Sequence, residues 1–183
     1  MAVHAEIPLI RQRYHDVLGA SLTPAYRSYL SRQSRGASTA ALGYRRAGAE
    51  PLFLERYLDQ PVEAAVSATF GQPVEREAIV EIGNFAADNA MAMIALWGDA
   101  ANDLGGSSEV AVATLTAPLR RMFARIGLPL KVLGPALASR LGDEAGDWGH
   151  YYQLDPQVCA GIISAGQQAI STFLQRRQRQ AAA

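Results

Sequence analysis

The sequence lacks several features, and each absence excludes a class of protein. Its 183 residues include one cysteine, Cys159, so no internal disulfide can form and a reducing compartment is expected. The 17 basic and 17 acidic residues give a formal net charge of zero, which argues against broad binding to nucleic acid or membranes. No stretch approaches the roughly 18–20 apolar residues of a membrane span. Residues 1–16 also lack the apolar core of a signal peptide. We expect a cytoplasmic protein without stable membrane insertion.

Motifs for metal binding and for serine hydrolysis are also missing. His4 and His15 have no second ligand at metal spacing, and His150 lies alone in an aromatic stretch. The Gly-x-Ser-x-Gly motif of α/β-hydrolases does not occur. We therefore expect no metal site and no permanently bound cofactor.

The composition that remains is typical of a globular domain with a real core, at 49% apolar and 19% charged residues. The length fits one domain over residues 1–183. Local patterns predict helices over 10–18, 24–30, 62–70, 87–104, 117–126 and 156–174, strands over 40–46, 75–81, 109–114, 130–133 and 148–152, and loops over 31–38 and 142–149. Strands and helices alternate without βαβ regularity, which predicts an α+β fold, an α/β sandwich with a mixed sheet.

The most informative segment is the β-branched run from Ile79 to Ile82, which contains Glu81 and is followed by Gly83-Asn84. An ionised carboxylate in a core strand costs several kcal/mol unless it has partners. A glycine in a strand allows another backbone or a ligand to approach closely. We interpret the segment as a site that opens in the middle of a sheet, where the strand breaks.

Burial would raise the pKa of Glu81 and suit it to act as a general base. The alternative is that Glu81 pairs with an arginine and only supports the structure. A bulge at Gly83-Asn84 would expose backbone N–H groups able to hold an oxyanion, with Asn84 as a further donor. The alternative there is a simple strand end with Asn84 in a turn.

Two further groups of residues are candidates. Arg45, with Arg46 and Arg35 nearby, suits a carboxylate or phosphate, although solvated surface charge is the alternative. In the aromatic cluster, Tyr151 or Tyr152 could act as general acid and Trp148 could form a pocket wall, or the cluster could be a core strand. Cys159 is expected in the core, on the inner face of the last helix.

The string LGYRRAGAEPLFLERYLDQPVE, followed by REAIVEIGNFA, AVATLTAPLRRMFARIGL and WGHYYQLDPQVCAGII, closely resembles the thermostable hemolysin family. The resemblance covers roughly residues 10–168. That family looks like a branch of the GNAT superfamily of N-acyltransferases, near the acyl-homoserine-lactone synthases. The likeness implies a GNAT-like fold with a largely antiparallel central sheet. It also implies N-acyltransferase activity, with an acyl thioester as co-substrate and a small amine or amino-acid-derived acceptor.

The resemblance also assigns roles to residues. The catalytic residues would be Glu81, Asn84 and Tyr151. The acyl donor would lie along Ile82, Gly83, Phe85 and Ala86, where the backbone would polarise the thioester carbonyl. The acceptor would contact Arg45, Glu50, Phe53, Trp148 and Tyr152.

One departure concerns the donor. GNAT enzymes that use coenzyme A usually follow this strand with a glycine-rich loop that holds the pyrophosphate at a helix N-terminus. Here the loop reads AADNAM, without glycine or cation, and Asp88 would repel phosphate. The donor is therefore either coenzyme A, bound weakly, or the phosphopantetheine of an acyl carrier protein. Arg120, Arg121 and Arg125 could dock an acidic carrier, or could form an ordinary solvated helix face.

Two other functions stay open at this point. The chain could be a non-catalytic binding protein that keeps the fold, which the missing phosphate loop supports. It could also be a membrane-active hemolysin, which requires a free amphipathic helix. Residues 87–104 are the one candidate for that helix, and Asp88, Asp99 and Asp103 make it acidic, which is wrong for anionic lipid. The sequence is compatible with a monomer or a homodimer.

Overall fold

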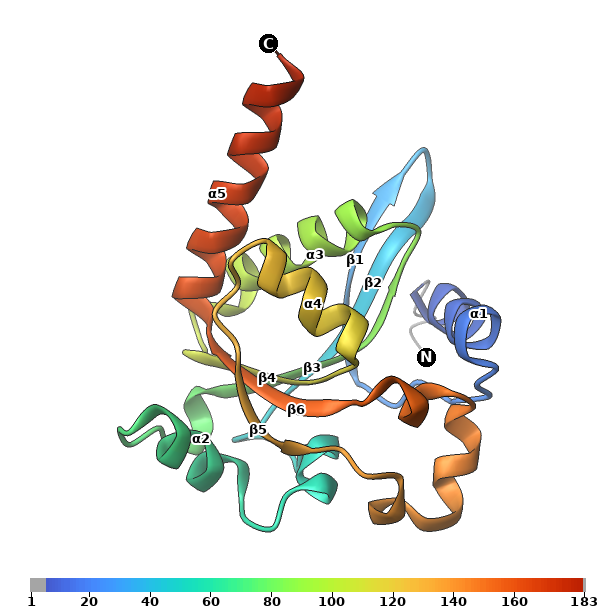
Figure 1. The fold of residues 1–183 in the computed structure, drawn as a ribbon, viewed down its shortest axis with the longest axis vertical. Helices are drawn as coiled ribbons and strands as arrows, with labels where there is room; N and C mark the ends of the chain where they lie inside the picture. Colours follow the sequence, from blue (N-terminus) through green and yellow to red (C-terminus); the bar gives the residue numbers. More distant parts are fainter. Residues whose placement is uncertain (1–5, 183) are drawn as a thin grey trace.

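The computed structural model describes residues 6–182, which build a six-stranded sheet covered by helices on both faces (Figure 1). The strand order is β1-β2-β3-β4-β6-β5. The strands are β1 (Ser28–Ser34), β2 (Ala37–Arg46), β3 (Ile79–Ala87), β4 (Val110–Leu115), β5 (Lys131–Pro135) and β6 (Gln157–Ile162). β3 and β4 run parallel, and the other neighbouring strands run antiparallel. This mixed, largely antiparallel sheet confirms the predicted fold class.

The helices divide between the two faces of the sheet. They are α1 (Glu6–Leu18), α2 (Val62–Phe70), α3 (Ala90–Leu104), α4 (Ala117–Arg125) and α5 (Ile163–Ala181). Helices α3, α4 and α5 pack on one face in the largest hydrophobic cluster, and α1 and α2 pack in two smaller clusters. The C-terminal part of α5 projects beyond the rest of the fold (Figure 1).

Short 3-10 helices complete the side of the sheet that carries α1 and α2. They are η1 (Phe53–Tyr57), η2 (Arg76–Ala78), η3 (Ala138–Arg140), η4 (Gly142–Trp148) and η5 (Tyr151–Leu154). Trp148 packs against Phe53 of η1 with ring centroids 5.8 Å apart. The long connection between β5 and β6 therefore covers η1.

Strand β3 is buried along almost its whole length, as its β-branched start predicts. It does not end at Gly83-Asn84. Gly83 pairs with Gly43 of β2, and pairing resumes at Ala86. Two residues of β3, Asn84 and Phe85, thus stand opposite one residue of β2, which is a β-bulge. The predicted strand break is therefore wrong, and the predicted bulge is present. The predicted strand start at residue 75 is also early, because η2 precedes β3.

The structure corrects five other local predictions. Residues 24–30 form no helix and residues 31–38 no loop, because β1 pairs with β2 in a hairpin across a turn at Arg35-Gly36. Polar β1 shows no clear period, so only this pairing identifies it as a strand. Residues 148–152 lie in 3-10 turns. The last helix begins at Ile163, because residues 157–162 pair with β4 and β5. Cys159 is buried, but on a strand.

Candidate functional site

The parallel strands β3 and β4 separate in the middle of the sheet. They pair over three positions, from Ile79 with Val110 to Glu81 with Val112. Beyond that point β3 continues to Ala87 along β2, and β4 continues to Leu115 along β6. A gap therefore opens between the two strands directly after Glu81, and backbone groups along it have no partner strand.

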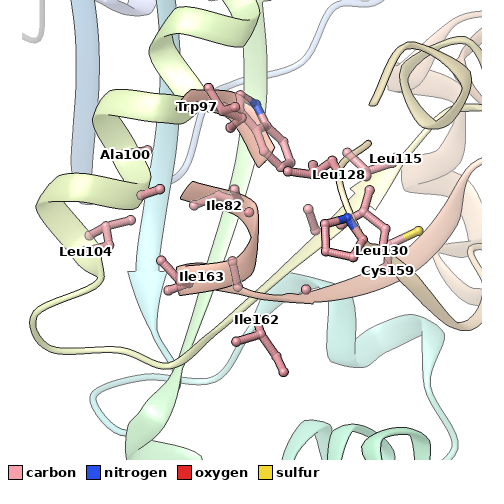
Figure 2. A pocket seen from close by; sticks show the side chains of 17 residues that line it. Ile82, Trp97, Ala100, Leu104, Leu115, Leu128, Leu130, Cys159, Ile162 and Ile163 are labelled. Atoms are coloured by element: carbon pink, nitrogen blue, oxygen red, sulfur yellow. The ribbon is translucent and has the colours of Figure 1, made fainter. Parts of the chain in front are cut away.

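Two cavities meet at this gap, and Ile82 lines both of them. The first, of about 50 Å³, lies among α3, α5, β4 and β6 and is lined only by apolar residues, among them Trp97, Leu128, Cys159 and Ile163 (Figure 2). Its volume is several times the roughly 10–15 Å³ that one water needs, and its walls are almost wholly apolar. The second cavity, which we call the Glu81 cavity, measures about 80 Å³ and lies on the side of α1 and η1.

Glu81 is the buried carboxylate that lines the second cavity, with 2% of its surface exposed. Its Oε2 accepts a hydrogen bond from the Phe53 N–H at 2.9 Å, and its Oε1 accepts one from the Leu54 N–H at 3.0 Å. These are the first two N–H groups of η1, so Glu81 ties that helix to the sheet. Burial raises the pKa of Glu81, and the N–H groups and Arg45 only partly offset it.

Arg45 lies opposite Glu81 on β2 and is mostly buried. Its Nε is 3.4 Å from Oε2 of Glu81, without hydrogen-bond geometry. Its two terminal nitrogens donate to the carbonyls of Pro51 and Ala25, each at 3.4 Å. Its guanidinium also stacks over the ring of Tyr26, 4.5 Å from the centroid. The guanidinium therefore contacts Glu81, two backbone carbonyls and the Tyr26 ring.

Tyr26 is a member of the site that the sequence did not reveal. Its ring lies over the paired glycines Gly43 and Gly83, and a Cβ at either position would collide with it. Its hydroxyl hydrogen bonds to Glu81 and lowers the pKa of that carboxyl. Burial and the negative charge of Glu81 raise the pKa of Tyr26 well above its ordinary value. The phenol therefore stays protonated and remains a donor toward the carboxylate.

The bulge places Asn84 at the wall of the Glu81 cavity in a left-handed conformation, with φ of 52°. Asparagine tolerates this region better than most residues. Its side chain is buried and interacts with the Tyr29 hydroxyl, whose pKa it lowers. On the other face, Phe85 begins an aromatic stack that continues through Trp97 to Phe123, with centroids 5.2 and 4.2 Å apart.

Tyr151 also lines the Glu81 cavity. It donates to the Thr114 carbonyl on β4 at 3.3 Å, and burial raises its pKa well above the ordinary value. Trp148 packs on Tyr151 with centroids 5.1 Å apart. Tyr152 lies behind this layer, where its hydroxyl and that of Tyr57 hydrogen bond at 2.7 Å.

The structure brings most of the predicted site residues into one cavity. The Glu81 cavity is lined by Arg45, Phe53, Glu81, Ile82, Gly83, Asn84, Phe85, Trp148 and Tyr151. Ala86, Glu50 and Tyr152 do not line it. Ala86 packs with α1, and Glu50 lies in the turn after β2. The sequence reading missed Tyr14, Tyr26 and Tyr57. Tyr14 lies within the predicted helix over residues 10–18, but nothing in the sequence pointed to Tyr26.

No group of three or more His, Cys, Asp or Glu side chains within residues 6–182 is arranged to hold a metal ion. No helix in the same range is long and apolar enough to cross a membrane.

Comparison with solved structures shows which known fold this is. TofI, in a ternary complex with an inhibitor and MTA, has a TM-score of 0.61 and 17% identity, over 93% of this chain and 91% of that one. The acyl-homoserine-lactone synthase LasI has a TM-score of 0.62 and 14% identity, over 91% of this chain and 85% of that one. FeeM, an N-acyl amino acid synthase from uncultured soil microbes, has a TM-score of 0.58 and 14% identity, over 90% of this chain and 92% of that one. At these identities the likeness shows a shared fold.

Comparison by sequence gives the family. No curated protein matches the chain. The sequence model of the thermostable hemolysin family matches residues 3–167, which is most of the chain. This match confirms the resemblance found in the sequence, and the chain belongs to the thermostable hemolysin family.

Proposed function

We propose that residues 1–183 act as one N-acyltransferase domain, which moves an acyl group from a thioester to an amine. The observation that carries the proposal is the gap between β3 and β4, with a buried carboxylate at its origin and a cavity on each side. The neighbouring folds support it, because they include acyl-homoserine-lactone synthases and an N-acyl amino acid synthase.

In the reaction, the amine nitrogen attacks the thioester carbonyl, a C–N bond forms and the C–S bond breaks. The products are an amide and a free thiol. Backbone N–H groups of the bulge from Gly83 to Phe85, with Asn84, would hold the oxyanion. Glu81 would take the amine proton directly or through a water, since its raised pKa makes it a better base. Tyr151, protonated at neutral pH, would return a proton to the departing thiolate.

The acyl chain would occupy the apolar cavity. That cavity is apolar and shares the wall residue Ile82 with the Glu81 cavity, so a thioester in the gap would extend its chain away from the acceptor. Each buried methylene contributes about 0.8 kcal/mol. Long or aromatic acyl groups should therefore be preferred over acetyl.

Either coenzyme A or the phosphopantetheine of an acyl carrier protein would supply the thioester, and the structure favours the carrier. The N-terminus of α3 is capped by its own Asn89, whose side chain accepts from the Ala92 N–H at 2.9 Å. Asp88 beside it pairs with Arg13 of α1. A pyrophosphate would have to compete with both carboxamide and carboxylate for this helix end.

The charges on α4 and α5 also fit an acidic carrier. Residues 110–142 and 156–183 contain no Asp or Glu. Arg120 is held by Asp155, which removes it from the predicted docking set. Exposed Arg121, Arg125 and Arg176 have no ion pair with any residue in the described part of the chain. Arg125 and Arg176 line one groove between α4 and α5, together with Phe173.

The test of acyl transfer is release of thiol and formation of amide, followed by mass spectrometry, from acetyl, octanoyl and decanoyl thioesters of coenzyme A, pantetheine and carrier protein. Binding is measured separately in the Trp148→Phe variant, where Trp97 in the apolar cavity is the remaining tryptophan. We expect Trp97 fluorescence to change with octanoyl and decanoyl donors. Binding without thiol release for any amine would identify a non-catalytic binding protein instead.

Charge reversal separates the two donors. Arg125→Glu with Arg176→Glu should lower kcat/KM for the acyl carrier protein and leave that for acyl-pantetheine unchanged. Arg11→Glu on the exposed side of α1 is the matched control. An equal loss with both donors would contradict docking at this groove.

A further inference from the structure

We propose that the amine acceptor has an aromatic or apolar body and carries no carboxylate or phosphate group. This inference rests on the proposed acyl transfer and specifies its second substrate. It follows from the charges and the walls of the Glu81 cavity.

The first argument is that the cavity offers no free cation. Arg45 is the one basic side chain among the described residues that line it. Its charge is balanced by Glu81, its terminal nitrogens donate to two backbone carbonyls, and one face is covered by Tyr26. A carboxylate binds arginine best through two parallel N–H groups of the fork. Here one N–H on each terminal nitrogen already donates to a backbone carbonyl, and Nε faces Glu81.

The second argument is the cost of bringing an anion into such a site. A buried carboxylate without a partner costs several kcal/mol, even after relaxation of its surroundings. Glu81 is already a buried anion in this cavity, and like charges at short range raise that cost further. An acceptor that carries its own carboxylate is therefore excluded by the same electrostatics that raise the pKa of Glu81.

The third argument is what the walls do offer. Seven aromatic residues line the cavity, namely Tyr14, Tyr26, Phe53, Tyr57, Phe85, Trp148 and Tyr151. Phe53, Trp148 and Tyr151 form a continuous packed layer, with centroids 5.8 and 5.1 Å apart. Flat or apolar groups bury well against such walls.

The same walls suit the nucleophile. Removal from water disfavours the charged form of an amine, so the pKa of a bound ammonium falls and more of the reactive free base is present. Glu81 in the cavity wall can accept the proton that is lost. A neutral cavity with one paired carboxylate thus selects an apolar amine and prepares it for attack.

The experiment compares amines with the amino acids from which they differ by one carboxylate. The pairs are 2-phenylethylamine with phenylalanine, tyramine with tyrosine, and isoamylamine with leucine. Binding is followed without any acyl donor in the Trp97→Phe variant, where Trp148 in the Glu81 cavity is the remaining tryptophan. We expect each amine to bind at least about tenfold more tightly than its amino acid, which corresponds to 1.4 kcal/mol. The aromatic amines should bind most tightly.

A second variant tests the cause. Glu81→Gln removes the charge that balances Arg45, so the cavity becomes cationic while its shape is kept. The ratio of amine to amino-acid affinity should then fall toward one or reverse. Equal or tighter binding of the amino acids by the Trp97→Phe protein would overturn the proposal. So would failure of every amine to bind at about 10 mM, a weaker affinity than any specific site would show. Neither result bears on donor binding, which Trp97 reports separately.

Discussion

Two carboxylates hold the 3-10 helix η1, and they differ in what they can do. Glu55 accepts the N–H groups of Leu52 and Val62 at 3.0 and 3.1 Å. Arg76 donates to both of its oxygens at 2.7 and 2.8 Å. These bonds lower the pKa of Glu55 to about 2. Glu81 also accepts two backbone N–H groups and faces an arginine, yet its pKa is raised.

The difference lies in burial and in the geometry of the arginine. The Glu55 side chain keeps 20% of its surface in water and meets a forked guanidinium head-on. The Glu81 side chain keeps 3%, and its arginine approaches side-on at 3.4 Å without a hydrogen bond. A carboxylate with a low pKa can anchor a helix but cannot take a proton near neutral pH. A buried carboxylate with a raised pKa can do both.

The contrast between Glu55 and Glu81 is tested most directly by removing each charge in turn and measuring acyl transfer. Glu81→Gln should lower kcat by about 10²–10⁴-fold, the range for loss of a general base. Glu55→Gln should leave the kcat of the folded protein near that of the wild type. The comparison fails if both variants lose activity equally, or if Glu81→Gln keeps full kcat across the pH range.

The position of Tyr26 offers a second test. Gly83→Ala would place a methyl against the Tyr26 hydroxyl, so Tyr26 must move away from Glu81. We expect a loss of about 1–3 kcal/mol in the free energy of unfolding, as for overpacked cores. Denaturant titration measures it.

The control for this prediction is a double-mutant cycle. Removing the hydroxyl with Tyr26→Phe should relieve part of the clash, so Gly83→Ala should cost less stability in that background. The two residues are not in contact as described if the costs simply add.

The structural carboxylate should show its effect in stability. Glu55→Gln weakens the bonds to Arg76 and should lower the free energy of unfolding by about 1–2 kcal/mol at pH 7, given that the pair is partly exposed. Chemical denaturation would measure the loss. Glu75→Gln, an exposed carboxylate just before η2, is the matched control and should change little. Equal losses in the two variants would rule out Glu55 as an anchor.

The pH dependence of stability should have opposite signs for the two carboxylates. The folded pKa of Glu55 is depressed, so its stabilising contribution is full above about pH 4.5 and is lost as the pH falls toward 2. The folded pKa of Glu81 is raised, so its contribution is full below about pH 4.5 and is lost as the pH rises through the folded pKa. Unfolding of wild type and both Gln variants at pH 3, 5 and 7 would show this, and slopes of the same sign would refute it.

The sequence was informative about Glu81 because a β-branched run predicts burial, whereas an ionised carboxylate prefers water. Burial and a raised pKa follow from that conflict alone. Its partners could not be predicted. They come from the N-terminus of η1, some 28 positions away, and from the cross-strand register that sets Arg45 opposite Glu81.

The errors had similar physical causes. The sequence did not point to Tyr26, because the space for its ring forms only when Gly43 and Gly83 pair across two strands. Strand β6 was read as the start of a helix, because a short apolar run of six residues fits either period. Asp155, directly before the predicted helix over 156–174, adopts a left-handed turn conformation before the strand. Patterns within one segment were predictable, and contacts between segments were not.

The bulge at Asn84 acts as a one-residue phase shift in β3. Val80 and Ile82 face α3 before the bulge, and Phe85 faces α3 after it. Ile82 and Phe85 are three positions apart, whereas residues on one face of a regular strand are two or four positions apart. Without the extra residue, Phe85 would turn toward α1 and the aromatic stack with Trp97 would lose its first ring. A deletion here is therefore a greater change than any substitution. A related chain whose β3 lacked the bulge would have to place different β3 side chains in the walls of both cavities.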